Sequence, residues 1–383
     1  MKVLHLLASW KWTGPAEPAL EGAALLSREP GLQVQAGLSS LQGRDQENQV
    51  EKEARRLGLE TLEGLKLPRH LNLAHLPGDV RRLAGILREG GFDLVHCHTL
   101  VDHFTAALAR LAAGVRVPLV RTWYDPEGPA LSFREAWLLR SGLEGAILPR
   151  PGAARELARR TKGRVKTEVL LPPVDLEGFD PSLPDMRKEY CCEEEDFVLG
   201  VVARMQAHRR WDLLLAAFRR ALWQVPFLKL IVLGRGPDWE RLVFSPAREI
   251  GVEERLVLAG YRRGTEYAST LRTFDALVFL VPGSDGTCRA ARQAQAAGAP
   301  LIASRRGILP DLVEPGVDGL LVEEKEEELA RAMAELALDR DKARAMGEAA
   351  RRRAEKEYSG EVFLRKTLAL YGEVLEGGGS CAG

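Results

Sequence analysis

Short hydrophobic stretches alternate along the chain with longer stretches in which apolar residues recur every three to four positions. The first pattern is typical of buried strands, and the second is typical of amphipathic helices that pack on a sheet. Their regular alternation predicts parallel sheets covered by helices on both faces. In the first half of the chain we expect strands at 2–7, 32–38, 92–98 and 118–122 and helices at 18–27, 76–89 and 104–112.

The second half of the chain continues this alternation, without an internal repeat of fixed period. There we expect strands at 197–202, 228–233, 255–259, 276–280 and 300–303 and helices at 211–223, 239–250, 326–338 and 341–357. Prolines between 172 and 184 and the acidic run 193–196 separate the two series, as a polar linker does. The sequence therefore predicts an α/β protein of two doubly wound, Rossmann-like domains, 1–170 and 171–360, whose strand ends face a central cleft.

Composition limits the function classes that fit these domains. The 383 residues are 45% hydrophobic and carry no formal net charge, so no overall field draws the chain to nucleic acid. The five cysteines are an odd number without zinc-site spacing, which favours a reducing compartment. The N-terminal apolar run 1–7 is too short for a secretion signal, and no apolar run approaches the roughly 20 residues of a spanning helix. We expect a cytoplasmic protein, for which any membrane contact would be peripheral.

The segment most informative about function is the loop 282–289, which joins a buried strand to an alanine-rich helix that stops at Gly298. Backbone N–H groups at such a helix start, left uncovered by small residues at the carboxyl end of a strand, bind phosphate in α/β proteins. Asp285 and Gln293 are separated by a rise of about 12 Å if the interval is helical, which is the reach of a nucleotide sugar. The alternative is that Ser284 or Asp285 caps the helix and Gln293 is solvated.

Arginines and glycines stand at other strand ends. Arg204 and Arg209 follow the first strand of the second series, where two guanidinium groups would neutralise a diphosphate leaving group. The alternative is a cluster of solvated surface arginines. Gly234 and Gly236 permit a tight turn after the next strand, and Gly14 permits close approach of a ligand after the first strand of the chain.

Histidines occur at the end of the strand 92–98. His96 and His98 flank Cys97 and point to the same side of a strand, but no third ligand stands at motif spacing, so we expect no metal site. We expect His98 to face the cleft as a hydrogen-bonding group. His103, one loop further on, is a second candidate for that role.

In this order the segments resemble the retaining, nucleotide-sugar-dependent glycosyltransferases of family 4, which have the GT-B fold. The resemblance covers nearly the whole chain. It rests on 13–17 for the glycine loop, 93–98 for Asp-x-x-His-x-His, 172–179 for the interdomain Asn-Gly-Val-Asp-x-x-x-Phe, 200–212 for Gly-x-x-x-Arg, 233–236 and 260–261 for the next two motifs, and 285–293 for Glu-x7-Glu.

The resemblance implies a role for each matched residue. Asp285, in place of the first glutamate, would bind the donor sugar, the amides of 286–289 the distal phosphate, and Gln293 the ribose. Arg204 and Arg209, which stands where the family has lysine, would neutralise the diphosphate without a metal. The candidates are catalytic Arg204, Arg209, Asp285 and His98; donor-binding Gly14, Gly234, Tyr261, Gly286, Thr287, Cys288, Arg289 and Gln293; and acceptor-binding Tyr124 and His103.

The resemblance implies transfer, with retention, of a sugar from a UDP- or GDP-linked donor to an envelope glycan or glycolipid, with no cofactor beyond the donor. The first domain would bind the acceptor and the second the donor, and a helix at 363–374, within the final segment 361–383, would cross back onto the first domain. Tyr124 stands where the family has a cleft histidine. Together with Asp285 and Gln293 it supports a rival, a non-catalytic GT-B protein that binds a nucleotide sugar or a partner chain. An epimerase or phosphorylase fits the loops less well.

A lipid-linked acceptor would favour a membrane-facing surface. The helix 76–89 carries three arginines, and Lys66, Arg69 and His70 precede it, which fits contact with an anionic membrane. The alternative, which we favour, is an ordinary amphipathic helix packed on the sheet.

Overall fold

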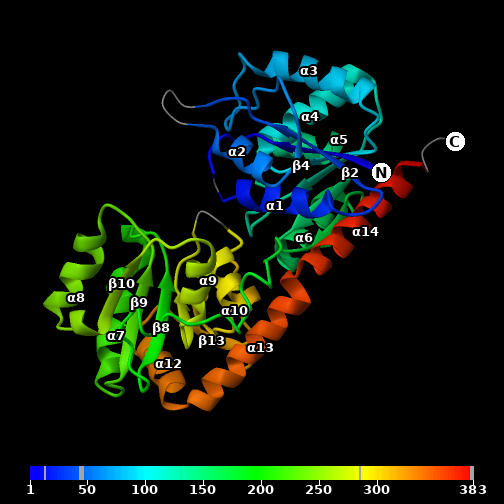
Figure 1. Ribbon diagram of the computed structural model, residues 1–383. Coiled ribbons are helices and arrows are strands. Elements are labelled where there is room, and N and C mark those ends of the chain that lie inside the picture. The colour runs from blue at the N-terminus through cyan, green and yellow to red at the C-terminus, as the bar shows by residue number, and fades with distance from the viewer. Residues whose placement is uncertain (13, 43–46, 131, 284–285, 380–383) are drawn as a thin grey trace. The chain divides into compact units, whose positions relative to one another are not determined.

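The computed structural model describes residues 1–12, 14–42, 47–130, 132–283 and 286–379 (Figure 1). Contacts divide the chain into two compact units. The N-terminal unit contains Met1–Pro173, Gly286, Thr287 and the helix that starts at Gly360, and the C-terminal unit contains Val174–Gly283 and Cys288–Ser359. Three residues of the predicted site loops, Thr13, Ser284 and Asp285, lie outside the described residues.

The N-terminal unit is built on a sheet of seven parallel strands in the order β3-β2-β1-β4-β5-β6-β7. The strands are β1 (Lys2–Leu7), β2 (Gln33–Leu38), β3 (Glu60–Leu62), β4 (Leu94–Cys97), β5 (Leu119–Thr122), β6 (Gly145–Leu148) and β7 (Lys166–Val169). Nearly every residue of β1, β4 and β6 is buried, because helices cover both faces of the sheet.

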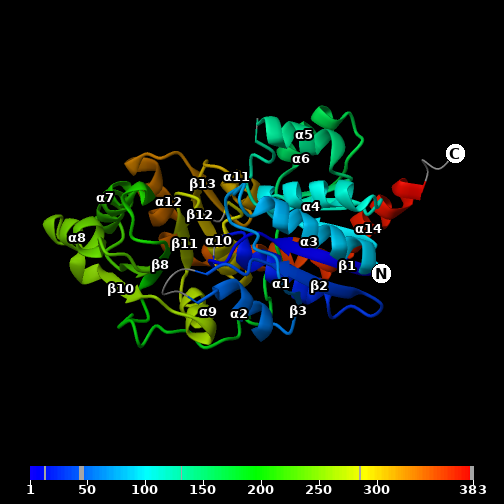
Figure 2. The same ribbon diagram turned by 90° about the horizontal axis from the view of Figure 1, so that it is seen from above.

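Seven helices cover this sheet in the described part of the unit. They are α1 (Ala16–Leu26), α2 (Gln49–Arg56), α3 (Leu76–Glu89), α4 (Leu100–Ala113), α5 (Phe133–Ser141), α6 (Pro151–Thr161) and α14 (Gly360–Gly379). The core between the sheet and α1 and α14 contains Val3, Val120 and Tyr371. Leu4, Val95 and Leu83 belong to the core on the opposite face, beneath α3 and α4 (Figure 2).

The C-terminal unit contains a sheet of six parallel strands in the order β10-β9-β8-β11-β12-β13. The strands are β8 (Phe197–Val202), β9 (Leu228–Leu233), β10 (Leu256–Gly260), β11 (Ala276–Phe279), β12 (Leu301–Ser304) and β13 (Gly319–Val322). The helices are α7 (Trp211–Leu222), α8 (Ser245–Glu249), α9 (Gly264–Arg272), α10 (Arg289–Ala296), α11 (Leu309–Leu312), α12 (Glu326–Leu338) and α13 (Arg340–Tyr358). A main core packs α7 and α12 against one face of the sheet.

In both sheets the strand order reverses beside the first strand of the unit. β1 lies between β2 and β4, and β8 lies between β9 and β11. At such a reversal the connections leave in opposite directions, so a crevice opens beyond the carboxyl ends of the two strands. The loops after β1 and β4 therefore meet in one unit, and those after β8 and β11 meet in the other. The predicted α/β class with two doubly wound, Rossmann-like units is confirmed.

The helix expected at 239–250 is present, but Glu240–Phe244 forms a π-helical turn that runs directly into α8. Pro246 cannot donate a backbone hydrogen bond, so the regular α-helical hydrogen bonding is interrupted there. One local prediction is wrong. The acidic run is not a linker, because Asp196 is buried, accepts a hydrogen bond from the Glu193 amide at 2.9 Å and pairs with Arg255 at 2.9 Å. This segment is part of the C-terminal unit.

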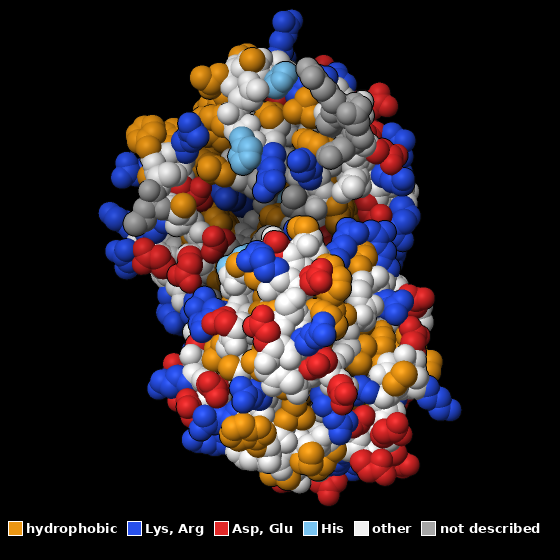
Figure 3. Space-filling view, turned by 90° about the vertical axis from the view of Figure 1, so that its left-hand side faces the viewer, with side chains coloured by type: hydrophobic (Ala, Val, Ile, Leu, Met, Phe, Trp, Pro, Cys, Tyr) orange, Lys and Arg blue, Asp and Glu red, His pale blue; other side chains and the backbone are white. Residues whose placement is uncertain are grey.

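The charged surface carries mixed signs. On the face in Figure 3, basic and acidic side chains are interspersed over both units, with apolar side chains scattered among them. Leu83, Ala84 and Leu87 of α3 are buried, while Arg81, Arg82 and Arg88 are exposed, so α3 packs its apolar face inward as the favoured alternative predicts. Among the described residues, no helix has the length and apolarity needed to cross a bilayer.

Gly234 brings the loop after β9 against the loop after β8. Its φ of +155° disfavours other residues, and a Cβ atom there would lie 1.9 Å from the carbonyl oxygen of Ala203. The Gly234 amide also donates to the carbonyl oxygen of Gly260 at 2.8 Å. Only glycine therefore fits at this strand end.

We expect Gly234→Ala to lower the free energy of unfolding of the C-terminal unit by more than about 2 kcal/mol, from backbone strain and steric overlap. Gly260→Ala is the matched control, because Gly260 has a φ of +71° but open space around the added carbon. It should cost only about 1 kcal/mol. Urea unfolding of both variants measures the difference, and equal losses would show that the overlap relaxes.

Candidate functional site

In the C-terminal unit, Arg209 spans the crevice between β8 and β11. It ends the short 3-10 helix Ala207–Arg209 that follows β8, and its Nη1 donates to the carbonyl oxygen of Val281, after β11, at 2.8 Å. Burial lowers the pKa of the Arg209 guanidinium, and the neighbouring cation of Arg204 lowers it further. Arg204 itself is exposed. Two cations thus lie together at the reversal of strand order, and a bound anion would offset the repulsion between them.

A small pocket at this point contains two buried hydrogen-bond donors without partners. It is lined by the ends of β8 and β11, the first turn of α7 and the side chains of Arg209 and Trp211. Arg209 Nε and Trp211 Nε1 are both buried, and neither has a hydrogen-bond partner among the residues that the structure describes. Leaving buried donors unsatisfied is costly, so two of them lining one pocket favour a ligand with acceptor oxygens at this point. The start of α7, whose N-cap Arg210 makes no side-chain cap, adds backbone donors nearby.

The N-cap residue of α10 does not cap the helix with its own side chain. This residue, Cys288, is buried in the left-handed conformation, with φ 51° and ψ 53°, and its side chain makes no capping hydrogen bond. Burial lowers the pKa of Arg289, the first residue of α10, to about 10, and the Arg292 cation adds to the effect. Arg292 is buried, with its guanidinium 5.6 Å from the ring centre of Tyr358. The start of α10 is thus strongly basic.

Two tyrosines border the predicted ribose and base positions. The hydroxyl of Tyr267, on α9, donates to Gln293 Oε1 at 3.0 Å, and the ring of Phe179 packs edge-on against Tyr267. Tyr261 is 52% exposed, with the guanidinium carbons of Arg235 and Arg263 at 4.5 and 5.0 Å from its ring centre. The sequence analysis identified Tyr261 and missed Tyr267, whose contact with Gln293 depends on the packing of α9 against α10.

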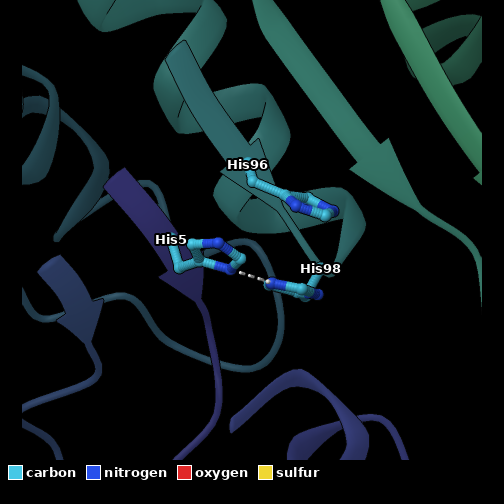
Figure 4. Close-up of side chains that lie close together, drawn as sticks. All are labelled: His5, His96 and His98. Carbon is cyan, nitrogen blue, oxygen red and sulfur yellow. Dashed lines mark hydrogen bonds between the residues drawn. The ribbon is translucent and has the colours of Figure 1, made fainter. Parts of the chain in front are cut away.

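In the N-terminal unit, three buried histidines lie together at the reversal of strand order (Figure 4). His5 on β1 is paired in register with His96 on β4, and His98 follows β4. One ring nitrogen of each histidine lies within 4.8 Å of one ring nitrogen of the other two. His5 is thus the third member that the sequence analysis did not find, because strand pairing and not sequence spacing brings it to His96 and His98.

Burial keeps these imidazoles neutral. It lowers the pKa of His5 to about 3, and it lowers the pKa values of His96 and His98 well below the ordinary range, with mutual repulsion as a further cause. Neutral imidazole is the form that binds metals. However, His5 Nδ1 and His98 Nε2 share a hydrogen bond of 3.0 Å, and the rings of His96 and His98 stack 4.5 Å apart. In this structure the His5 and His98 nitrogens are therefore hydrogen-bond partners of each other.

Tyr124 and Asp102 complete this group. The Tyr124 hydroxyl lies 2.8 Å from His98 Nδ1, so two of the predicted residues meet. The buried Asp102 carboxylate accepts from the amides of Ala8 and His98 at 3.0 and 3.1 Å, which ties the loop after β1 to the loop after β4. Burial raises the pKa of Asp102 to about 6, although hydrogen bonds from Thr99 and Ala8 oppose the shift.

The other two candidates of this unit lie apart from the cluster. His103, on α4, is fully buried, and its Nε2 donates to the carbonyl oxygen of Gly142 at 2.7 Å. It does not line the pocket around the three histidines, so its acceptor-binding role has no geometric support. Gly14 lies in the turn before α1.

Comparisons with known proteins identify the family of the chain. Residues 184–353 match the family model described as "Glycosyl transferases group 1", and residues 41–177 match "Glycosyltransferase Family 4". The chain belongs to the family 4 glycosyltransferases of the GT-B type. His96, His98 and Tyr124 lie within the second match and Arg204, Arg209 and Gln293 within the first, whereas His5 and Tyr371 lie outside both.

Relatives and solved structures resemble this family 4 protein over much of its length. A D-inositol 3-phosphate glycosyltransferase of Mycobacterium marinum is 29% identical over 62% of this chain and 55% of its own length. One of Kribbella flavida is 31% identical over 68% of this chain and 66% of its own length. The chain thus spans between about half and two thirds of the length of these two relatives. The structure of Anabaena Alr3699/HepE with UDP has a TM-score of 0.79 at 19% identity and covers 97% of this chain and all of that one.

Acid is expected to destabilise this family 4 protein, because its buried histidines must take up protons when it unfolds. Their folded pKa values lie below the ordinary 6.5, so their stabilisation is complete above that pH and is lost as the pH falls below it. Between pH 6.5 and 5 each such histidine removes about 2 kcal/mol from the free energy of unfolding. The raised pKa of Asp102 opposes this trend between about pH 4 and 6.

Guanidinium unfolding at pH 7 and pH 5 measures the effect. His103→Gln keeps a donor for the Gly142 carbonyl but removes one titrating group, whose pKa burial lowers to about 3. The variant should therefore lose about 2 kcal/mol less than the native protein on acidification. An identical pH dependence in both proteins would contradict the assignment of His103 as a buried neutral histidine.

Proposed function

We propose that this protein transfers a sugar from a UDP-linked donor to an acceptor hydroxyl, with retention of anomeric configuration. The observation that carries the proposal is the pair of unpartnered buried donors, Arg209 Nε and Trp211 Nε1, beside Arg204 at the β8/β11 reversal. A diphosphate supplies the acceptor oxygens and negative charge that this group lacks. The names of the relatives and the UDP of the HepE structure support a nucleotide-sugar donor.

The donor would contact residues of three loops. Arg204 and Arg209 would neutralise the diphosphate, backbone amides of 286–289 would hold the distal phosphate, and Gln293, held by Tyr267, would bind the ribose diol. Tyr261 lies beyond β10, where its exposed ring offers a surface for the base. We propose that these cations take the place of a metal ion.

The reaction would proceed on one face of the sugar. The bond from the anomeric carbon to the diphosphate oxygen breaks as the acceptor oxygen bonds to the same carbon. The departing phosphate oxygen takes the acceptor proton, so charge and configuration are both accounted for. Electrostatic stabilisation of the leaving diphosphate is the largest contribution expected from the protein.

The acceptor proposal is a hydroxyl of an envelope glycan or glycolipid. The relatives named for D-inositol 3-phosphate make a small phosphorylated polyol the competing acceptor. A panel containing both classes, assayed for sugar transfer from UDP-glucose and UDP-N-acetylglucosamine, separates them. UDP binding without transfer or donor hydrolysis would instead favour the non-catalytic rival.

We expect the native protein to bind UDP in calorimetry and Arg209→Gln to weaken that binding by about ten- to a hundredfold, since a charged donor to phosphate is lost. Trp211→Phe keeps an aromatic ring but removes the indole N–H, and should cost about three- to tenfold. Arg220→Ala is the control, because Arg220 lies at the far end of α7 and pairs only with surface glutamates among the described residues.

The control variant should bind UDP as the native protein does. A native protein that is folded and fails to bind UDP or GDP would refute the donor proposal. Equal binding by the native protein and Trp211→Phe would show that the indole N–H does not contact the ligand.

A further inference from the structure

Six side chains of the N-terminal unit form one continuous chain of hydrogen bonds. The Tyr124 hydroxyl meets His98 Nδ1 at 2.8 Å, and His98 Nε2 meets His5 Nδ1 at 3.0 Å. Tyr371, on α14, connects His5 on β1 with His96 on β4. Its hydroxyl lies 3.5 Å from His5 Nε2 and 2.6 Å from His96 Nδ1. His96 Nε2 ends the chain at the Thr122 hydroxyl, 2.8 Å away.

The chain must have a single direction, because each neutral imidazole has one donor and one acceptor nitrogen. Tyr371 stands at its centre, and its hydroxyl can donate to only one of its two neighbours. The contact to His96 Nδ1 is shorter than the contact to His5 Nε2, and short contacts are typical of a donating hydroxyl, so the Tyr371 hydroxyl donates to His96. The Tyr371 oxygen then accepts from His5 Nε2–H, and this choice fixes every other bond.

The remaining tautomers follow step by step. His5, protonated at Nε2, accepts at Nδ1, so His98 must donate from its own Nε2. His98 Nδ1 is then an acceptor, and the Tyr124 hydroxyl donates to it. In the other direction His96 accepts at Nδ1 and donates from Nε2 to Thr122. All three histidines are therefore Nε2–H tautomers.

We propose that Tyr371 and His5 are positioning residues that hold His98 and Tyr124 in one tautomeric and hydrogen-bonding state. Their pocket is lined by the three histidines, Thr122 and Tyr124 and walled by apolar side chains that include Phe363 of α14. The effect of this network on transfer rests on the proposed function, whereas the tautomers themselves do not. Neither His5 nor Tyr371 lies within a region matched by the family models.

The hydrogen-bond network forms only when α14 packs on the sheet of the N-terminal unit. Lys366, just over one turn before Tyr371, pairs with Glu168 at 2.8 Å and donates to the Val169 carbonyl oxygen at 3.0 Å, which fixes α14 on β7. The ring of Tyr371 packs edge-on against His96, and its side chain is fully buried. A residue more than 270 positions from His96 in the sequence thus sets its protonation site.

Long-range nitrogen–proton NMR correlations of the imidazole rings test the proposal directly, because Nδ1–H and Nε2–H tautomers give different patterns. At pH 7 the native protein should show three neutral Nε2–H histidines for His5, His96 and His98. In Tyr371→Phe the signals of His5 and His96 should become mixtures of tautomers, and His98 should follow through His5. Tyr358→Phe is the matched control, since that buried hydroxyl has no hydrogen-bond partner in the described part of the chain. It should leave the three patterns unchanged.

A second variant and a second readout separate the possible outcomes. His5→Gln keeps an amide donor toward Tyr371 but has no acceptor at the ring position of His5 Nδ1, so the His98 pattern should change while that of His96 persists. In Tyr371→Phe the rate of UDP-glucose hydrolysis should fall about tenfold with the Kd for UDP unchanged. A native protein that fails to bind UDP would refute the proposed function and leave the tautomer result standing.

Three results would overturn the inference. One is an Nδ1–H tautomer at any of the three histidines in the native protein. Another is an unchanged set of patterns in both Tyr371→Phe and His5→Gln. The third is a stoichiometric zinc ion, detected by elemental analysis, whose removal by chelator shifts all three histidine signals, since the cluster would then be a metal site.

Discussion

Parallel pairing of strands that are distant in the sequence is the constraint on which the arginine group of the C-terminal unit and the histidine network of the N-terminal unit both depend. The β1/β4 ladder places His5 opposite His96, and the β8/β11 pairing lets Arg209 reach the carbonyl of Val281. Side chains alternate between the two faces of a sheet, so a shift of register by one residue would turn His5 toward α3 and α4 and away from Tyr371. Asp102 reinforces this register by binding the loops after β1 and β4 with one carboxylate.

The arginine group of the C-terminal unit and the histidine network of the N-terminal unit differ in charge. The C-terminal unit gathers Arg204, Arg209 and Arg289 near strand and helix ends, where burial and mutual repulsion lower the pKa values of Arg209 and Arg289. A ligand with two negative charges would stabilise such a group of cations most strongly. The histidine network of the N-terminal unit is neutral, and each of its nitrogens has a partner. The network offers oriented hydrogen-bond donors and acceptors without a charge, and these suit an uncharged hydroxyl.

The sequence predicted the elements that depend on local pattern. The strands at 197–202 and 228–233 and the helices at 76–89 and 326–338 have the predicted bounds, because their apolar periods are clear and their ends carry glycine, proline or charged residues. Weaker apolar periods left α5, β6 and α6 unpredicted, and the apolar period alone does not predict the π-helical turn before Pro246. Motif spacing pointed to Arg204, Arg209, His98 and Tyr124. It could not point to His5, Trp211, Tyr267 or Tyr371, whose roles depend on strand register, burial or helix docking.

The buried donors of Arg209 and Trp211 hold a diphosphate in the proposed function. A crystal structure of the protein soaked with UDP would locate that diphosphate. We expect phosphate oxygens within hydrogen-bond distance of Arg209 Nε and Trp211 Nε1, at the crevice between β8 and β11. UDP bound elsewhere, with both donors still unpartnered or turned to other protein groups, would contradict it.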